Sequence, residues 1–151
     1  MKKLFFTFAM LLGSLSFLYS QTTPEDIFKT FGSEENAQLM TLDGDMLSAM
    51  KAQAGEDADK LEGIEAITVL DISQCDQSAK DEFEKATGSM QLDGYETLVR
   101  VNEEGVTARI MGKVEGDIVR DMIVVVTGEA HVLVQMKGSI NMSDVNSMMQ
   151  F

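Results

Sequence analysis

The stretch from Tyr95 to Ile140 constrains the fold of this chain most, because it predicts four β-strands joined by three tight turns. Apolar and polar residues alternate along the runs 106–114 and 131–140, and a period of two is typical of half-buried strands. Each turn contains a glycine, which can adopt the positive φ that tight hairpins need. Connections this short leave no room for a crossover, so neighbouring strands must be antiparallel and form a meander.

The third strand of this block differs from the others, since Met122 to Val126 is an uninterrupted apolar run. A run that is apolar on both sides is typical of a strand that is covered on both faces. We expect helices to cover one face. The simplest interpretation of the other face is a central strand lying under the C-terminal segment, and the alternatives are a helix, a partner or a ligand.

Capping residues and hydrophobic spacing place the remaining elements. The expected helices are Pro24–Phe31, Asp45–Gln53, Asp76–Ser89 and Asn141–Gln150, the expected strands are Ala37–Leu42 and Ile64–Ile72, and Ala54–Gly63 is an acidic connector. Helices in the first half and at the end, with strands gathered in the second half, indicate an α+β fold. We expect one mostly antiparallel sheet with a C-terminal four-strand meander and helices packed on one face.

The first 20 residues indicate export. A charged start with Lys2 and Lys3 is followed by the apolar core Leu4–Leu18, which predicts a signal peptide cleaved after Ser20. This segment is too short to span a membrane, and no cysteine lies near the junction to carry a lipid. We therefore expect a signal peptide at residues 1–20, a single α+β domain at residues 21–151, and a periplasmic or secreted location.

The charge of the mature chain restricts its partners. Without residues 1–20 the chain keeps ten basic and 25 acidic side chains, a net charge of −15. Such a charge repels nucleic acid and anionic lipid, so we expect no nucleic-acid binding and no membrane insertion after the signal peptide is removed. A solvated acidic surface explains the charge most simply, and a cationic partner or divalent ions are the alternatives.

The sequence contains no recognisable catalytic constellation. Its one histidine, His131, begins the last long strand on the polar side, where we expect it to be exposed, and no serine lies in a Gly-x-Ser-x-Gly turn. One histidine and the one cysteine, Cys75, are too few for a zinc site. We therefore expect no enzyme and assign no catalytic, cofactor-binding or metal-binding residue. Cys75 is interpreted as a buried, inert thiol, with an intermolecular disulfide as the alternative.

Two other groups of residues suggest metal sites but have simpler explanations. The acidic runs 43–45 and 56–59 lack the spacing of a calcium-binding hand loop, so we interpret them as solvated turns, although the sequence leaves open whether the acidic loop binds a divalent ion. Ten methionines remain after residue 20, and thioethers bind copper(I). Filling of the core explains them better, because several fall at core positions of expected helices. These are Met46, Met50, Met142, Met148 and Met149.

The order of these elements resembles a family of small exported domain-of-unknown-function proteins from Gram-negative bacteria of the gut type. The residues that carry the resemblance are the Met46-Leu47 helix, Ile67-Thr68-Val69-Leu70, the Phe83 helix, the run Tyr95 to Val101, and Gly138-Ser139-Ile140. The resemblance covers nearly all of the mature chain and lies in core patterning rather than catalysis. It implies an envelope location, an uncharacterised role and a link to genes for envelope-responsive sigma factors, and it supplies no functional residues.

Three functions are compatible with these observations. The first is a non-enzymatic exported domain that binds another component of the cell envelope, with an envelope protein or a second copy of the chain as partner. The alternative is a small-molecule carrier with an apolar pocket between sheet and helices, lined by methionine and phenylalanine. The third is a hydrolase that uses His131, which requires a carboxylate or a hydroxyl close to that imidazole.

Overall fold

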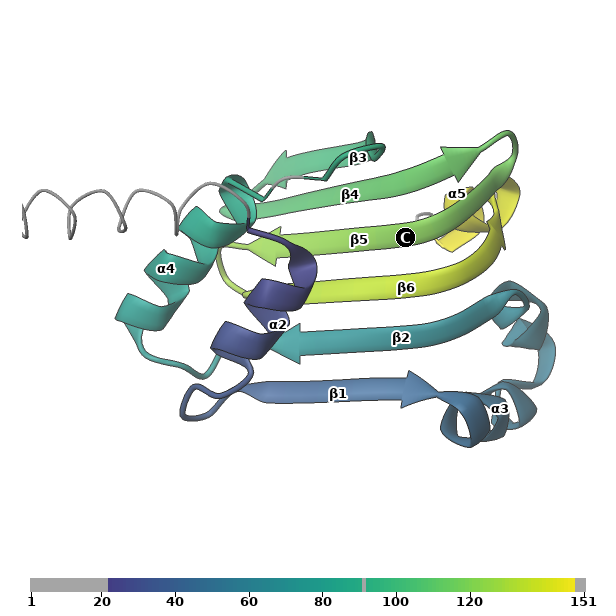
Figure 1. Ribbon diagram of the computed structural model, residues 1–151, viewed down its shortest axis with the longest axis horizontal. Coiled ribbons are helices and arrows are strands. Elements are labelled where there is room, and N and C mark those ends of the chain that lie inside the picture. Colours follow the sequence, from purple (N-terminus) through teal and green to yellow (C-terminus); the bar gives the residue numbers. More distant parts are fainter. Residues whose placement is uncertain (1–21, 91, 149–151) are drawn as a thin grey trace, which may run out of the picture.

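The fold consists of one six-stranded antiparallel sheet and helices that lie at its two ends (Figure 1). It is given by a computed structural model that describes residues 22–90 and 92–148. The spatial strand order is β1-β2-β6-β5-β4-β3. In chain order the elements are α2 (Pro24–Phe31), β1 (Gln38–Asp43), α3 (Gly44–Gln53), the 3₁₀ helix η1 (Gly55–Leu61), β2 (Ile64–Asp71), α4 (Gln77–Gly88), β3 (Glu96–Glu103), β4 (Val106–Glu115), β5 (Ile118–Thr127), β6 (Val132–Asn141) and α5 (Met142–Met148).

The α+β class and the C-terminal meander are confirmed. Strands β3 to β6 pair in sequence order, and every pairing in the sheet is antiparallel. Strand β5, which contains the apolar run, lies between β4 and β6 inside the sheet. The expected signal peptide lies outside the described residues.

The helix ends follow from the sequence. Thr23 forms a capping box with Asp26 at the start of α2, and Pro24 occupies the first turn, where its missing N–H costs nothing. Asp76 caps α4 by accepting a hydrogen bond from the backbone N–H of Ala79 at 2.8 Å. Helix α3 follows directly from β1, and the side chain of Asp43 makes no such bond.

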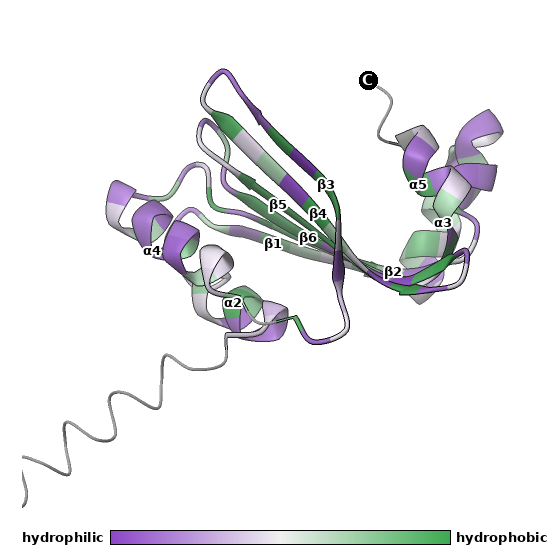
Figure 2. Ribbon diagram, turned by 90° about the horizontal axis from the view of Figure 1, so that it is seen from above, coloured by the Kyte–Doolittle hydropathy of each residue, from purple (hydrophilic) through white to green (hydrophobic). Residues whose placement is uncertain are grey.

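The helices do not share one face of the sheet, which corrects that part of the expected architecture. Helices α2 and α4 cover one face at one end, while α3 and α5 lie on the opposite face at the other end (Figure 2). Two separate hydrophobic clusters result. The first contains Ile27, Phe31 and Phe83 packed on β-strand residues such as Leu133, and the second contains Leu47 and Val145 packed on Ile140 and its neighbours.

A row of register shifts crosses the sheet between its two ends. The shifts fall at residues 64–66 of β2, 119–121 of β5 and 97–99 of β3. Bulges bend strands and change which face a side chain occupies. Ile64, for example, belongs to the α3/α5 cluster although the strand period assigns it to the face of Leu70, which packs under α2 and α4.

Two glycines allow β2 and β6 to approach each other closely at their register shift. Gly63 and Gly138 have φ of +83° and +152°, values that L side chains rarely adopt. A Cβ on Gly138 would lie 2.0 Å from the carbonyl oxygen of Gly63, and a Cβ on Gly63 would lie 2.1 Å from that of Ser139. The backbones of β2 and β6 therefore approach each other closely just where the sheet bends.

The two parts of the sheet that no described helix covers differ in polarity. On the α2/α4 face the uncovered end carries the charged residues Lys113, Asp121 and Lys137. On the α3/α5 face the uncovered end is mostly apolar, with Gln38 and Asp71 at its β1/β2 edge, and we call its apolar residues the open surface. The open surface consists of Met40, Val69, Val99, Val101, Ala108, Val124, Val126, Val132 and Val134.

The open surface belongs to neither hydrophobic cluster. Met40 and Val101 are 51% and 41% exposed, and its other residues are half-buried by their neighbours in the sheet. Alternate residues of the same strands, such as Leu133 and Ile123, are fully buried under α2 and α4. The more apolar face of the meander is therefore not the one that these helices cover.

Candidate functional site

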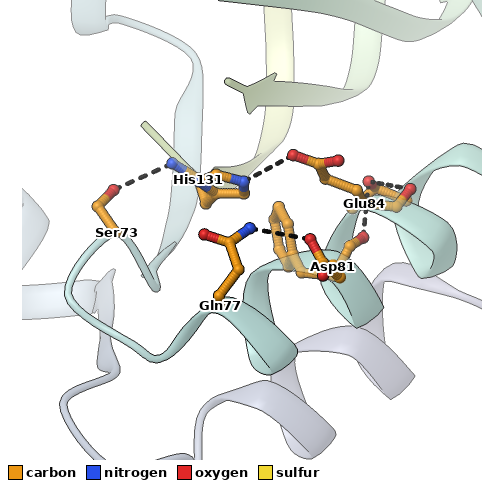
Figure 3. Close-up of polar contacts among 7 residues, drawn as sticks. Ser73, Gln77, Asp81, Glu84 and His131 are labelled. Atoms are coloured by element: carbon orange, nitrogen blue, oxygen red, sulfur yellow. Dashed lines mark hydrogen bonds and ion pairs between the residues drawn. The ribbon is translucent and has the colours of Figure 1, made fainter. Parts of the chain in front are cut away.

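His131 is buried, with an exposed fraction of only 3%, which corrects the expectation of an exposed side chain at a strand end. Its Nε2 lies 2.8 Å from a carboxylate oxygen of Glu84 on α4, and its backbone N–H donates to the hydroxyl of Ser73 at 3.0 Å (Figure 3). The strand period puts His131 on the polar side of the strand, but that side faces α4 here. Glu84 supplies the partner that lets a buried imidazole be tolerated.

The Glu84–His131 pair resembles two parts of a catalytic triad but lacks the third. A carboxylate can orient an imidazole, which then needs a hydroxyl or thiol at its other nitrogen. The Nδ1 of His131 is buried and has no hydrogen-bond partner among the described residues. The hydrolase hypothesis therefore has its carboxylate, but among the described residues no hydroxyl or thiol is hydrogen-bonded to the free nitrogen of the imidazole.

A hollow of about 420 Å³ lies beside this pair, between the end of α4 and strands β3, β4 and β5. Its lining is unusually basic for this acidic chain, because two of the three arginines, Arg100 and Arg109, lie there. The full lining is Glu84, Thr87, Gly88, Arg100, Asn102, Thr107, Arg109, Val125 and Thr127.

The two arginines of the hollow are cross-strand neighbours. Arg100 on β3 and Arg109 on β4 are directly opposite each other in the antiparallel register. An Nη of Arg109 donates a hydrogen bond to the carbonyl oxygen of Thr87 at 2.8 Å, near the end of α4. Burial lowers the pKa of Arg109, and the positive charge of Arg100 lowers it further. The negative charge of an anion in the hollow would oppose this lowering, because it favours the charged guanidinium.

A second hollow, of about 370 Å³, lies beside α2 on the same face of the sheet. Its lining is Glu25, Phe28, Lys29, Leu39, Ala66, Thr68, Gln135 and Lys137. Neither hollow is lined by methionine, and Phe28 is the one phenylalanine in either lining. The two hollows therefore give no support to a carrier pocket of methionine and phenylalanine between sheet and helices.

Comparison with known proteins identifies a family but no function. Residues 30–148 match the family described as a domain of unknown function, DUF4252. The chain belongs to this family. No curated protein and no solved structure matches the DUF4252 chain.

The single cysteine of the DUF4252 chain, Cys75, is buried, with an exposed fraction of 6%. Burial raises the pKa of the Cys75 thiol, and the charges of Glu34 and Asp76 raise it further. A protonated, buried thiol is a poor nucleophile, so this geometry favours the inert thiol over the intermolecular disulfide.

The methionines of the DUF4252 chain divide between core and surface. Met111 and Met122 are buried in the two hydrophobic clusters, whereas Met46 is 59% exposed, so its expected core position is wrong. Helix α3 turns Leu47 inward instead. The side chain of Met148 and the whole of Met149 lie outside the described residues.

The acidic runs of the DUF4252 chain show no gathered ligand set. Within residues 22–90 and 92–148, no three histidine, cysteine, aspartate or glutamate side chains come close enough to hold an ion. Asp57 pairs instead with Lys60 at 2.8 Å, and this hydrogen bond lowers the pKa of Asp57.

Within the described residues, no helix is long and apolar enough to cross a membrane.

The residues that line the basic hollow were not singled out by the sequence. A signal for them does exist, because the turn at Glu104-Gly105 fixes the register of β3 against β4 and thereby pairs Arg100 with Arg109. The position of α4 over this hairpin has no comparable signal. The sequence alone therefore does not predict that Glu84 and Thr87 line the same hollow.

Proposed function

We propose that this protein is an exported, non-enzymatic binding domain of the cell envelope that docks a protein partner on the open surface. The observation that carries the proposal is the contrast between the two uncovered ends of the sheet. One end presents charged side chains such as Lys113 and Asp121, as a solvated surface should. The other presents a valine-rich surface that no described helix covers.

The composition of the open surface supports a partner. Burial of apolar area contributes about 25 cal/mol per Å², so an uncovered valine surface leaves that stabilisation available for docking. Contiguous apolar patches of a few hundred Å² on soluble proteins are often functional. Strands β5 and β6 at its centre contribute Val124, Val126, Val132 and Val134, and no charged side chain lies between them.

The shape of the open surface favours a protein over a small molecule. At about 4.8 Å between strands, six strands give a width of roughly 25 Å, and one or two residues of each strand on this face give a length of up to roughly 13 Å. The area, roughly 300–350 Å², is a little under half of what one partner buries in a standard interface. Small-molecule sites are instead concave pockets. Polar residues around the open surface would form the rim of the interface.

The proposed location rests on the N-terminal segment. The charged start and the apolar run Leu4–Leu18 support export through a signal peptide. The strong negative charge of the mature chain suits an aqueous compartment, because it keeps the protein soluble while the open surface is unoccupied. Export, a Gram-negative source and the envelope partner are all parts of this proposal.

The test is site-specific photo-cross-linking in the cells that make the protein. A photoreactive residue replaces Val134 at the centre of the open surface, and the control replaces the exposed Thr41 on the α2/α4 face. We expect Val134, and not Thr41, to give an adduct with an identified envelope protein, and we expect Val124→Lys to abolish it.

The other outcomes are distinguishable. An adduct between two copies of the chain would make the partner a second copy. Adducts at Thr41 equal to those at Val134, or none at Val134, would contradict docking on the open surface. Circular dichroism of each variant confirms that the fold is retained.

A further inference from the structure

We propose that the basic hollow binds a small oxyanion, a phosphate or carboxylate group, between the guanidinium groups of Arg100 and Arg109. The hollow lies on the α2/α4 face, opposite the open surface. This inference is therefore independent of the proposed docking of a protein partner, and either one can fail alone.

Arg100 and Arg109 place two like charges directly opposite each other on neighbouring strands. Charged side chains of the same sign directly opposite each other on two strands destabilise a sheet. This chain has 25 acidic residues but only three arginines, and it nevertheless places Arg100 opposite Arg109. The third arginine, Arg120, shows the usual solution, since it pairs with Glu115 at 3.1 Å.

Neither arginine of the hollow is neutralised by a carboxylate among the described residues. Among the described residues, no carboxylate oxygen lies within 4.0 Å of a guanidinium nitrogen of Arg100 or Arg109. One of the five N–H groups of Arg109 donates to the carbonyl of Thr87 and so caps the C-terminal end of α4. This bond does not explain why a second arginine lies beside Arg109.

The geometry suits an oxyanion. The bond to Thr87 holds one Nη of Arg109, which restrains the guanidinium group and reduces the entropy that it loses on binding. Arg100 is exposed and can close on the ligand from β3. Planar forks of this kind bind carboxylate and phosphate groups through paired hydrogen bonds. The neutral side chains of Asn102 and Thr107 line the same hollow and add donors.

Glu84 limits which anions fit. Its carboxylate also lines the hollow, and one of its oxygens is held by His131 at 2.8 Å. A ligand that is negative throughout would be repelled at that side. The hollow of about 420 Å³ therefore fits a small molecule or headgroup whose one anionic group meets the arginines.

The test is calorimetric titration of the chain 21–151 with inorganic phosphate and, separately, with acetate, at constant ionic strength. Titration with vesicles that carry an anionic phospholipid distinguishes a lipid headgroup from a free anion. We expect saturable binding in at least one arm, and at least about tenfold weaker binding in Arg100→Gln, because each charge-assisted hydrogen bond contributes about 1.5–3 kcal/mol.

The controls separate the proposed site from general charge effects. Arg120→Gln removes the same charge elsewhere and should leave the affinity unchanged. Arg109→Lys keeps the charge but loses the planar fork, so it should weaken binding. Absence of binding in every arm, or equal affinity for Arg100→Gln and the unaltered chain, would overturn the proposal. Urea unfolding of each variant checks that weaker binding does not result from a loss of folded protein.

Discussion

Tyr95 is the residue whose ionisation the fold changes most clearly. Burial raises its pKa above the ordinary value of about 10, and a hydrogen bond to Asp121 and the charge of that carboxylate raise it further. Asp121 in turn accepts hydrogen bonds from the amide of Gln135, which is 5% exposed, at 3.2 Å. The phenol therefore belongs to a polar cluster on the α2/α4 face of the sheet.

This cluster predicts a loss of stability in alkali. A raised pKa means that the fold favours the neutral phenol, so the contribution is present below pH 10 and is lost as the pH rises beyond it. After residue 20 the chain has no other tyrosine and no tryptophan, so tyrosinate absorbance reports Tyr95 alone. We expect its midpoint well above 10 in the folded chain and near 10 in urea.

The matched variant for this titration is Tyr95→Phe. It should remove part of the fall in unfolding free energy between pH 9 and pH 11, and Cys75, whose pKa burial also raises, should account for part of the remainder. A folded-state midpoint at the unfolded value would show that the phenol is not held in this cluster.

At this scale, the sequence predicts apolar core residues better than polar ones. Ile27, Phe28 and Phe83 follow from helical spacing and are buried. His131 and Gln135 are buried too, although strand alternation places them on the polar side. Their burial depends on partners from distant elements, Glu84 and Asp121, and one strand's pattern contains no information about such partners.

At the scale of single elements, the two N-caps offer a matched comparison. The side chain of Asp76 accepts a hydrogen bond within the first turn of α4, whereas Asp43 precedes α3 without one. We expect Asp76→Ala to lower the unfolding free energy by about 1 kcal/mol. Asp43→Ala, which removes the same charge near a helix start, should change it by less than about 0.5 kcal/mol.

Urea unfolding of both variants measures the difference. Equal losses would mean that charge near the helix start, and not the cap bond, stabilises α4. The slope of the unfolding curve with urea should be unchanged, because neither substitution alters the surface exposed on unfolding.

The elements were predictable because their signals are local. Thr23-Pro24 and Asp76 mark helix starts, and Gly105 and Gly116 mark hairpins, so the order of elements agrees with the structure. The distribution of helices over two faces was not predictable. It depends on the register shifts across the sheet, such as the one between Ile64 and Ala66, and each shift involves two strands at once.

At the scale of the whole molecule, each end of the sheet has a helical cover on one face only. At the first end α2 and α4 lie on one face (Figure 2), and the open surface lies on the other. Leu133 and Val134 are neighbours in β6 that point to these two faces. Leu133 is fully buried, while Val134 is half-buried and belongs to neither cluster.

This arrangement predicts unequal costs for two adjacent truncations. Leu133→Ala leaves a cavity under α2 and α4 and should lower the unfolding free energy by about 2–5 kcal/mol. Val134→Ala removes two methyl groups from a half-exposed position and should cost about 1 kcal/mol or less. Urea unfolding at low protein concentration measures both values for the chain alone. A Val134→Ala loss as large as that of Leu133→Ala would show that the chain covers its own valine surface. A loss that grows with protein concentration would instead show that a second copy covers it.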